Sequence, residues 1–218
     1  GEWRARVTGI GYDEVFLKHG IAEHPERPQR LLVAVQRLEE TGLLAEMLRL
    51  PVRAATLEEL TMLHDPSYVD EVRLLSEMGG GDIDLDTRAT RGTWEAACAA
   101  AGVCIDAARA VYSRDLDNAF CMVRPPGHHA REHTGMGFCF FNNLGLAAEA
   151  LIRDGCRRVA LLDFDGHHGN GTQESFYHRA DVLYISLHQS PLFPGTGAAD
   201  EIGVGEGAGL NLNIPVPR

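Results

Sequence analysis

The sequence predicts an α/β fold with a mostly parallel sheet, on three observations. Short apolar segments that are typical of strands alternate with helical segments along the 218 residues. Polar and ionisable side chains follow directly after several of these strands, which is where ligands bind in parallel sheets. The chain has no internal repeats, low-complexity tracts or flexible linkers, so residues 1–218 are expected to form one domain.

The first half of the chain is expected to contain two strands and three helices. The segment 8–13 reads as the first strand, and a polar loop follows it. Residues 29–40 have apolar side chains at helical spacing and end before a glycine. A helix over 65–78 opens on Asp-Pro and ends at three glycines, and 93–112 is an alanine-rich segment long enough for a buried helix. The short apolar segment 118–123 predicts the second strand.

The second half is expected to continue the alternation. A capped helix over 142–154 ends at a glycine, and the apolar run 157–164 predicts a buried strand. A short helix near 172–178 comes next. Two further strands are expected at 182–187 and 210–216, which completes the α/β pattern.

Composition narrows the classes of function. The chain has 20 basic and 31 acidic residues, and the net charge of −11 argues against nucleic acid as the main partner but is compatible with cationic substrates. No segment approaches the roughly 18 apolar residues of a membrane span, and no basic-then-apolar leader opens the chain. Five scattered cysteines without C-x-x-C spacing indicate a reducing compartment, so we expect a cytoplasmic protein. The chain stops just after a strand-like segment, so we also expect a fragment.

The segment 163–172, D-F-D-G-H-H-G-N-G-T, is the most informative part of the chain. It places two carboxylates and two imidazoles at the end of an apolar strand, where burying unpaired charge costs several kcal/mol. Asp165 and His167 are two residues apart, so in extended backbone both side chains would point to one face. An isolated D-x-H is more often a simple hydrogen-bonded pair, but four such groups together favour a divalent metal, and zinc fits one oxygen and one nitrogen ligand.

A second cluster, His128-His129, follows a rigid Pro-Pro-Gly turn. Such a pair is usually a surface feature, but here an apolar segment follows it, and imidazole can shuttle protons near neutral pH. Asp163 and Asn170 are available to orient the two rings. A third polar cluster, at Ser186 and His188, also follows a strand, so three clusters are expected to converge at one edge of the sheet.

Five motifs, in this order, resemble the histone deacetylase family, which includes bacterial deacetylase-like amidohydrolases. They are H-P-E-R-P-x-R-L (24–31), R-P-P-G-H-H-A (124–130), G-F-C-F-F-N-N (137–143), D-F-D-G-H-H-G-N-G-T-Q (163–173) and S-L-H-Q…F-P-G-T-G (186–197). The resemblance extends from Gly9 to Pro217. It implies a three-layer α/β fold with a mostly parallel sheet of the arginase/deacetylase type, incomplete at its C-terminal side because about the last third of the family's domain is missing.

The resemblance also implies roles for the polar side chains. Asp165 and His167 would be two of three zinc ligands. His128 and His129 would lie beside the metal, with Asp163 paired to the first and Asn170 to the second. Class I members carry Asp at this position. Class II and many bacterial members carry Asn, as this chain does at Asn170. A neutral amide stabilises an imidazolium less than a carboxylate does, so we expect His129 to be the less basic of the two histidines.

Further roles concern a cation and the substrate. Asp163 and Ser186, with the carbonyls of Asp165, His167 and Leu187, would hold a monovalent cation, K⁺ or Na⁺. Phe138 and Phe193 would line a narrow tunnel for a lysine-like chain, and Gly137 would contact its amide. Asp86 would hold the substrate backbone at the rim, although L-D-L-D leaves the register against Asp84 open. The set implied for substrate is therefore Asp86, Gly137, Phe138 and Phe193.

The implied activity is zinc-dependent removal of acetyl groups from acetyl-lysine or similar acylated amines. His129 would take a proton from water and return it to the leaving amine, and His128 with Asp163 would give electrostatic support. The substrate could equally be an acetylated polyamine, and a non-catalytic binding or scaffold domain is the alternative of a different class. Arginase-type binuclear manganese enzymes use D-x-H-x-D, but Gly169 stands at the last position here, so a mononuclear site is favoured.

Two parts of the family's site have no matching motif. A third zinc ligand, a downstream aspartate, and a tyrosine that donates to the oxyanion are both absent from the 218 residues. Two ligands hold zinc weakly, and loss of an oxyanion donor lowers the rate by about 10²–10³. We therefore expect these residues alone to be nearly inactive and poor in metal.

Overall fold

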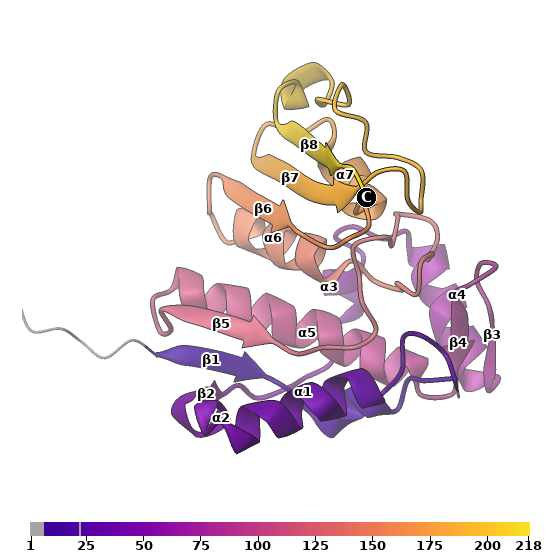
Figure 1. The fold of residues 1–218 in the computed structure, drawn as a ribbon, viewed down its shortest axis with the longest axis vertical. Coiled ribbons are helices and arrows are strands. Elements are labelled where there is room, and N and C mark those ends of the chain that lie inside the picture. Colours follow the sequence, from indigo (N-terminus) through magenta and orange to yellow (C-terminus); the bar gives the residue numbers. More distant parts are fainter. Residues whose placement is uncertain (1–6, 22) are drawn as a thin grey trace, which may run out of the picture.

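The computed structural model describes residues 7–21 and 23–218, and it has the α/β architecture predicted from the sequence (Figure 1). Strands and helices alternate along most of this length. The strands are β1 (Thr8–Gly11), β2 (Leu48–Arg49), β3 (Gly80–Asp82), β4 (Arg88–Thr90), β5 (Asn118–Cys121), β6 (Val159–Asp163), β7 (Val182–Gln189) and β8 (Asn211–Val216). The helices are α1 (Gln29–Glu40), α2 (Leu43–Glu46), α3 (Leu57–Leu60), α4 (Pro66–Glu77), α5 (Thr93–Tyr112), α6 (Asn143–Arg153) and α7 (Asn170–Phe176), with 3₁₀ turns η1 (Glu14–Leu17) and η2 (Gly205–Gly207).

The parallel sheet is present as two pieces. The first sheet has the strand order β2-β1-β5 and the second sheet has the order β6-β7-β8, and all pairs within them are parallel. In the first sheet Ile10 is opposite Phe120, and in the second Asp163 is opposite Ser186. A small antiparallel hairpin, β3-β4, lies apart from both. Figure 1 shows β5 and β6 as facing edges with α5 and α6 behind them.

Helix α5 is the centre of the apolar core. It packs against α6, α4, β1 and β5. Its length of 20 residues and its many alanines let it approach these neighbours closely, and most of its side chains from Ala96 to Ile105 are buried. Gly102 illustrates this closeness, because a Cβ there would lie 2.2 Å from the carbonyl oxygen of Arg53.

The second sheet has an unusual distribution of side chains. Helices α6 and α7 contact β6 and β7, and the buried positions of β7 are Val182, Tyr184, Ser186 and His188. On β8 the buried residues are Asn211 and Asn213. The opposite face carries exposed apolar side chains, namely Leu162, Leu187, Leu212, Ile214 and Val216. The buried face is thus largely polar and the exposed face is apolar, the reverse of the common pattern.

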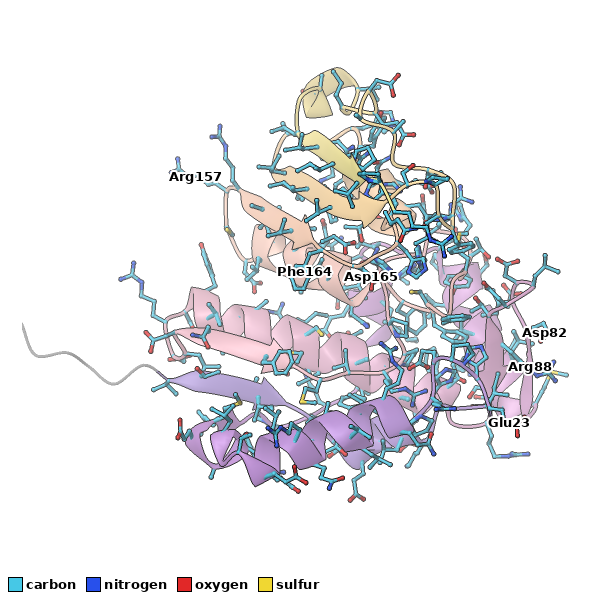
Figure 2. All side chains as sticks on the ribbon, viewed as in Figure 1. Glu23, Asp82, Arg88, Arg157, Phe164 and Asp165 are labelled. Atoms are coloured by element: carbon cyan, nitrogen blue, oxygen red, sulfur yellow. The ribbon has the colours of Figure 1, made fainter. Side chains whose placement is uncertain are left out.

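A groove of about 970 Å³ separates the facing edges of β5 and β6. Its lining is mainly apolar and comes from α5, α6 and the two strands, but His128, Asp163 and Asp165 reach it at one end. Figure 2 labels Phe164 and Asp165 where the chain leaves β6, between the two sheets. The carboxyl ends of the parallel strands therefore open onto one polar region, as expected for this fold class.

Several expected elements match the observed bounds. Helices α1 and α5 cover the residues predicted for them, and α4 and α6 start directly after N-cap residues Asp65 and Asn142, whose side chains accept hydrogen bonds from Ser67 N and Gly145 N. The expected strands are present but mostly shorter. The elements α2, α3, β2, β3 and β4, each of two to four residues, were not predicted, because such short segments show no measurable periodicity. Over the described residues no helix is long and apolar enough to cross a membrane.

Candidate active site

The loop that carries the tandem histidines is fixed by a buried ion pair. Arg124, directly after β5, pairs with Glu26, and the side chains are only 3% and 2% exposed. The Arg124 guanidinium also donates to the carbonyl oxygens of Phe16, at 2.9 Å, and His19, at 2.7 Å. A buried charge needs such complete pairing. The H-P-E-R-P and R-P-P-G-H-H motifs are therefore held together by one guanidinium.

The two tandem histidines each have one hydrogen-bonded partner. His128 Nδ1 lies 2.9 Å from Asp163 Oδ2, and His129 Nδ1 lies 2.9 Å from Asn170 Oδ1. The ring centroids of the two histidines are 4.0 Å apart. The structure thus brings together the four side chains that the resemblance paired. In both cases the partner oxygen accepts, so each Nδ1 carries the proton in the neutral ring and each Nε2 has a free lone pair.

Burial makes His129 a weak base. Burial first, and then the neighbouring His128, lower the pKa of His129 to about 4, although the hydrogen bond to Asn170 acts in the opposite direction. The imidazole of His129 is therefore neutral at physiological pH. The cause is burial and not the neutral amide, so the expected effect of Asn170 on the basicity of His129 stays a prediction.

Asp163 is the most connected carboxylate of the site. Its Oδ2 accepts from Tyr184 Oη at 3.0 Å as well as from His128, and its Oδ1 accepts from Asp165 N at 3.2 Å. Burial raises the pKa of Asp163, but the hydrogen bonds and the nearby His128 outweigh it, so the net pKa lies below the ordinary value. Tyr184 was not predicted as a site residue. The only signal for it was its place on the buried side of strand 182–187.

Asp165 and His167 meet by a different route from the one predicted. The chain bends after Asp163 and is not extended at 165–167. Within this bend His167 N donates to Asp165 Oδ1 at 2.8 Å, and His167 Nδ1 lies 3.0 Å from the same oxygen. The expectation of an extended segment was wrong because the Asp165 carboxylate accepts from His167 N and closes an Asx-type turn. The side chains still come together and are 52% and 46% exposed.

The donor set fits part of a zinc site. A carboxylate oxygen and an imidazole nitrogen face each other beside two histidines with free Nε2 atoms, which is the chemistry that zinc ligation needs. Across residues 7–21 and 23–218, however, no group of three or more His, Cys, Asp or Glu side chains is arranged to hold a metal. The described residues therefore provide two ligands of the kind expected and not a closed coordination shell.

The proposed cation residues lie next to this pair in the second sheet. Ser186 is opposite Asp163 in the β6–β7 register and is fully buried, with its Oγ 2.9 Å from His188 Nδ1. Leu187 follows it with a half-exposed side chain. Asp163, Ser186 and Leu187 thus lie at the same strand ends, although their cation role stays a prediction.

The residues named for substrate binding surround the histidines unevenly. The Phe193 ring is 5.2 Å from the His129 ring and 6.3 Å from the His167 ring. Gly137 has φ +54°, and a Cβ there would lie 2.4 Å from His129 Cδ2, so only glycine fits. The Phe138 ring packs instead against His24, at 4.6 Å.

The two aspartates named for the rim have different hydrogen-bond partners. Asp86 Oδ1 accepts from Gly137 N at 3.2 Å, and Phe138 N donates to the neighbouring Thr87 at 3.0 Å. Asp84 instead accepts from Leu85 N in the hairpin turn. Of the two aspartates in L-D-L-D, Asp86 is therefore the one that lies against the Gly137 segment.

Comparison with known proteins gives the family. A sequence profile of the histone deacetylase domain matches residues 24–218. The chain belongs to the histone deacetylase family. A probable deacetylase of Archaeoglobus fulgidus is 44% identical over 214 residues, which are 97% of this chain and 59% of that protein. The histone deacetylase-like amidohydrolase of Pseudomonas aeruginosa is 44% identical over 199 residues, 90% of this chain and 52% of that protein.

A solved structure of the histone deacetylase family also superposes closely. The crystal structure of the HDA15 HD domain gives a TM-score of 0.94 at 41% identity and covers 96% of this chain and 62% of that one. This confirms the arginase/deacetylase-type α/β fold. The chain thus spans 59% of the Archaeoglobus protein, 52% of the Pseudomonas protein and 62% of the HDA15 HD domain, less than two thirds of each.

Sequence analysis also missed a buried histidine, His64, that connects segments next to the site. His64 is 3% exposed and accepts at Nε2 from Asn142 N, at 2.9 Å, while its Nδ1 donates to Arg131 O, also at 2.9 Å. Burial lowers the pKa of His64 to about 4. It therefore stays neutral and connects the segments that flank the site. Nothing in its sequence context marks it, because a lone histidine belongs to no motif.

Proposed function

We propose that this chain forms part of a zinc-dependent deacetylase that hydrolyses the amide of acetyl-lysine or of a similar acylated amine. One observation supports this most. Two imidazoles, each held by a single acceptor at Nδ1, lie beside a facing carboxylate and imidazole at the end of a parallel strand. This arrangement combines proton transfer with metal ligation in one place.

Asp165 and His167 would hold the zinc ion. When bound, zinc polarises an amide carbonyl and promotes ionisation of water. The family's third ligand would have to come from beyond the described groups, since these do not form a set of three. We therefore expect weak zinc binding by residues 1–218 alone.

His129 would be the base. Its Nδ1–H donates to Asn170 Oδ1, which leaves Nε2 unprotonated, and its low pKa of about 4 keeps it so at neutral pH. It can then accept a proton from water and return it to the leaving amine, which gives free amine and acetate. His128 donates to Asp163, and a second proton at its Nε2 would let the ring stabilise negative charge that develops nearby.

The remaining residues would bind a cation and the substrate. Asp163, Ser186 and carbonyls of 165, 167 and 187 would hold K⁺ or Na⁺, which would balance the buried Asp163 carboxylate. Gly137, Phe138 and Phe193 would contact an acyl-lysine-like chain, with Asp86 at the rim. The five free cysteines favour a reducing compartment, so we propose the cytoplasm as its location.

The test compares acetate release and zinc content in the complete product of the gene. We expect acetate release from an acetyl-lysine peptide or an acetylated polyamine, with the ratio of the two rates defining the substrate class. Asp165→Asn should weaken zinc binding by more than the roughly 10- to 100-fold that loss of an outer partner costs. His178→Asn, at an exposed position after α7, is the control and should change neither. No acetate release from either substrate, with zinc binding unaffected by Asp165→Asn, would refute the proposal.

A non-catalytic binding domain is the second candidate. It is favoured by one observation, that the described residues contain no set of three metal ligands. It predicts acylated-peptide binding without hydrolysis even when zinc is supplied in excess. Against it, His128 and His129 each have a hydrogen-bonded acceptor at Nδ1, the arrangement that a role in proton transfer would use.

A further inference from the structure

A buried hydrogen-bond network lies beside the candidate active site, with Gln173 of α7 at its centre. Gln173 Oε1 faces three nitrogen atoms, namely Asn211 Nδ2 at 2.9 Å, Asn213 Nδ2 at 2.8 Å and His168 Nε2 at 3.0 Å. Its own Nε2 donates to Glu201 Oε2 at 2.6 Å. A carboxylate at neutral pH only accepts, so the amide orientation of Gln173 is determined, and His168 Nε2 must carry a proton.

His168 connects this network to a second segment of the chain. The side chain is 1% exposed, and its Nδ1 lies 2.7 Å from Thr196 Oγ1. With the proton on Nε2, the neutral ring accepts the Thr196 hydroxyl hydrogen at Nδ1. Thr196 itself is exposed, so this hydrogen bond attaches a surface segment, 190–197, to a buried imidazole.

Gly197 shows how closely that segment is held. Its carbonyl oxygen accepts from His188 Nε2 at 3.0 Å, and its N donates to Glu201 at 3.2 Å. The rings of His168 and His188 are 4.8 Å apart. A Cβ on Gly197 would lie 2.5 Å from His188 Nε2 and 2.6 Å from His168 Cγ, and its φ is +89°. Only glycine can therefore occupy this position.

The same segment places Phe193 at the candidate site. The Phe193 ring is near the His129 and His167 rings, and its Cε1 lies 3.0 Å from the Cβ position of Gly137. His168 follows His167 directly in the chain. His168 is thus joined by a peptide bond to the proposed metal ligand His167 and by a hydrogen bond to the segment that carries Phe193.

We propose that His168 is a positioning residue, which through Thr196 sets the place of Phe193 relative to His167 and so determines how well an acylated amine chain fits. This rests on the proposed deacetylase function. His168 does not touch substrate itself. The hydrogen bond between Thr196 and His168 holds the segment that carries Phe193 and does not involve the reacting atoms. Its loss should therefore affect substrate binding more than the chemical step.

Thr196→Val tests this most directly, because it removes the hydroxyl and nearly keeps the shape. In the complete protein we expect KM for an acetyl-lysine peptide to rise about five- to tenfold, the value of one hydrogen bond, with kcat changed less than twofold. Thr196→Ser should restore the wild-type KM. Thr41→Val is the matched control, since Thr41 donates to helix carbonyls on the exposed end of α1, away from the site.

A second measurement does not depend on catalysis. We expect NMR cross-peaks between the Phe193 and His129 ring protons in the wild type, weakened in Thr196→Val and restored in Thr196→Ser, at unchanged zinc content. Unchanged cross-peaks in Thr196→Val, or a fall in zinc content in place of the KM change, would overturn the positioning role. A complete wild-type protein that releases no acetate from either substrate, and whose zinc binding does not depend on Asp165, would instead refute the proposed function, while the cross-peaks would still decide the role of His168.

Discussion

The two sheets of this molecule are stabilised in different ways. Around the first sheet, apolar side chains such as Ile10, Val103 and Met122 form one continuous cluster with α1 and α5. On the buried face of the second sheet, Ser186 and Asn213 take positions where apolar residues are usual. Ser186 is hydrogen-bonded to His188 within β7, and Asn213 donates to Gln173 of α7 and to a carbonyl in the loop after β7. Apolar burial is non-directional, whereas hydrogen bonds fix the orientation of each group.

This difference bears on the location of the site. An imidazole that must present one particular nitrogen needs a partner at the other, and the second sheet supplies such partners at its strand ends. The larger apolar clusters lie around α5 and the first sheet, and the cluster on the second sheet is the smallest of the three. The molecule therefore combines an apolar scaffold with a polar region that orients functional groups.

The largest expected effect is an exception to this comparison. It concerns a polar pair at the end of the first sheet, which is otherwise stabilised by apolar burial. Glu26→Gln leaves the buried Arg124 without its counter-charge, which should lower the free energy of unfolding by about 3–5 kcal/mol in urea denaturation. Glu95→Gln is the control. Glu95 pairs with Lys18 at an exposed site, so its loss should cost about 1 kcal/mol or less. Equal losses in the two variants would contradict the importance of burial.

The second prediction compares the free-energy cost of a lost polar contact with that of a lost apolar contact. Gln173→Leu removes the acceptor shared by three buried donors, so it should cost about 2–3 kcal/mol although it adds apolar volume. Ile105→Val, in the fully buried centre of α5, removes one methyl group and should cost about 1 kcal/mol. Urea unfolding of both variants gives the two values. If Gln173→Leu leaves the free energy of unfolding unchanged, the polar face does not depend on the hydrogen bonds of Gln173.

A third prediction concerns the pH dependence of stability and His64, a buried histidine whose two ring nitrogens are both hydrogen-bonded. Its folded pKa is about 4, below its ordinary value of 6.5, so below pH 6.5 the unfolded chain binds a proton that the folded chain excludes. Stability should therefore be full above pH 6.5 and fall toward pH 4, by about 1.4 kcal/mol per pH unit well inside this window.

The measurement for His64 is the free energy of unfolding at pH 7.5 and pH 5.5 for the wild type and for His64→Gln. Both proteins share all other titrating groups, so the difference between their slopes isolates His64. We expect a shallower slope for the variant. Identical slopes would show that folding does not change the pKa of His64.

The smallest effect is local to the site. Asn170→Asp places a carboxylate at His129 Nδ1 and should raise the pKa of His129 from about 4 by about one unit or more. Titration of the His129 ring protons by NMR gives this value without any activity measurement. A shift in the apparent acid pKa of the pH–rate profile in the same direction is expected. No rise in either measurement would show that the partner at Nδ1 has little influence on the ring.

The sequence predicted the long elements well and the polar contacts poorly. Helices α1 and α5 were located to the residue because periodicity over 12 or 20 positions is clear. The His128–Asp163 and His129–Asn170 pairs could be named because motifs carry them. Hydrogen bonds between isolated residues far apart in the chain, such as Gln173 with Asn213, leave no pattern to read.

The bend at 165–167 shows a different limit. The spacing of Asp165 and His167 was informative, but the backbone that brings them together was predicted to be extended and is a turn. Glycine permits both conformations, so local sequence cannot choose between them. The choice is made by hydrogen bonds that form only in the folded structure.

The exposed apolar face and the open strand edges also govern how these 218 residues behave in solution. Leu162 on β6 and Leu212 and Ile214 on β8 are exposed, and β6 and β8 are the edge strands of their sheet, which can pair with another strand. Attraction between molecules should therefore increase with protein concentration and with sulfate or phosphate salts, which strengthen apolar association. Light scattering across a concentration series would register this as a rising apparent mass. The exposed apolar face of the second sheet would thus set how strongly the protein self-associates.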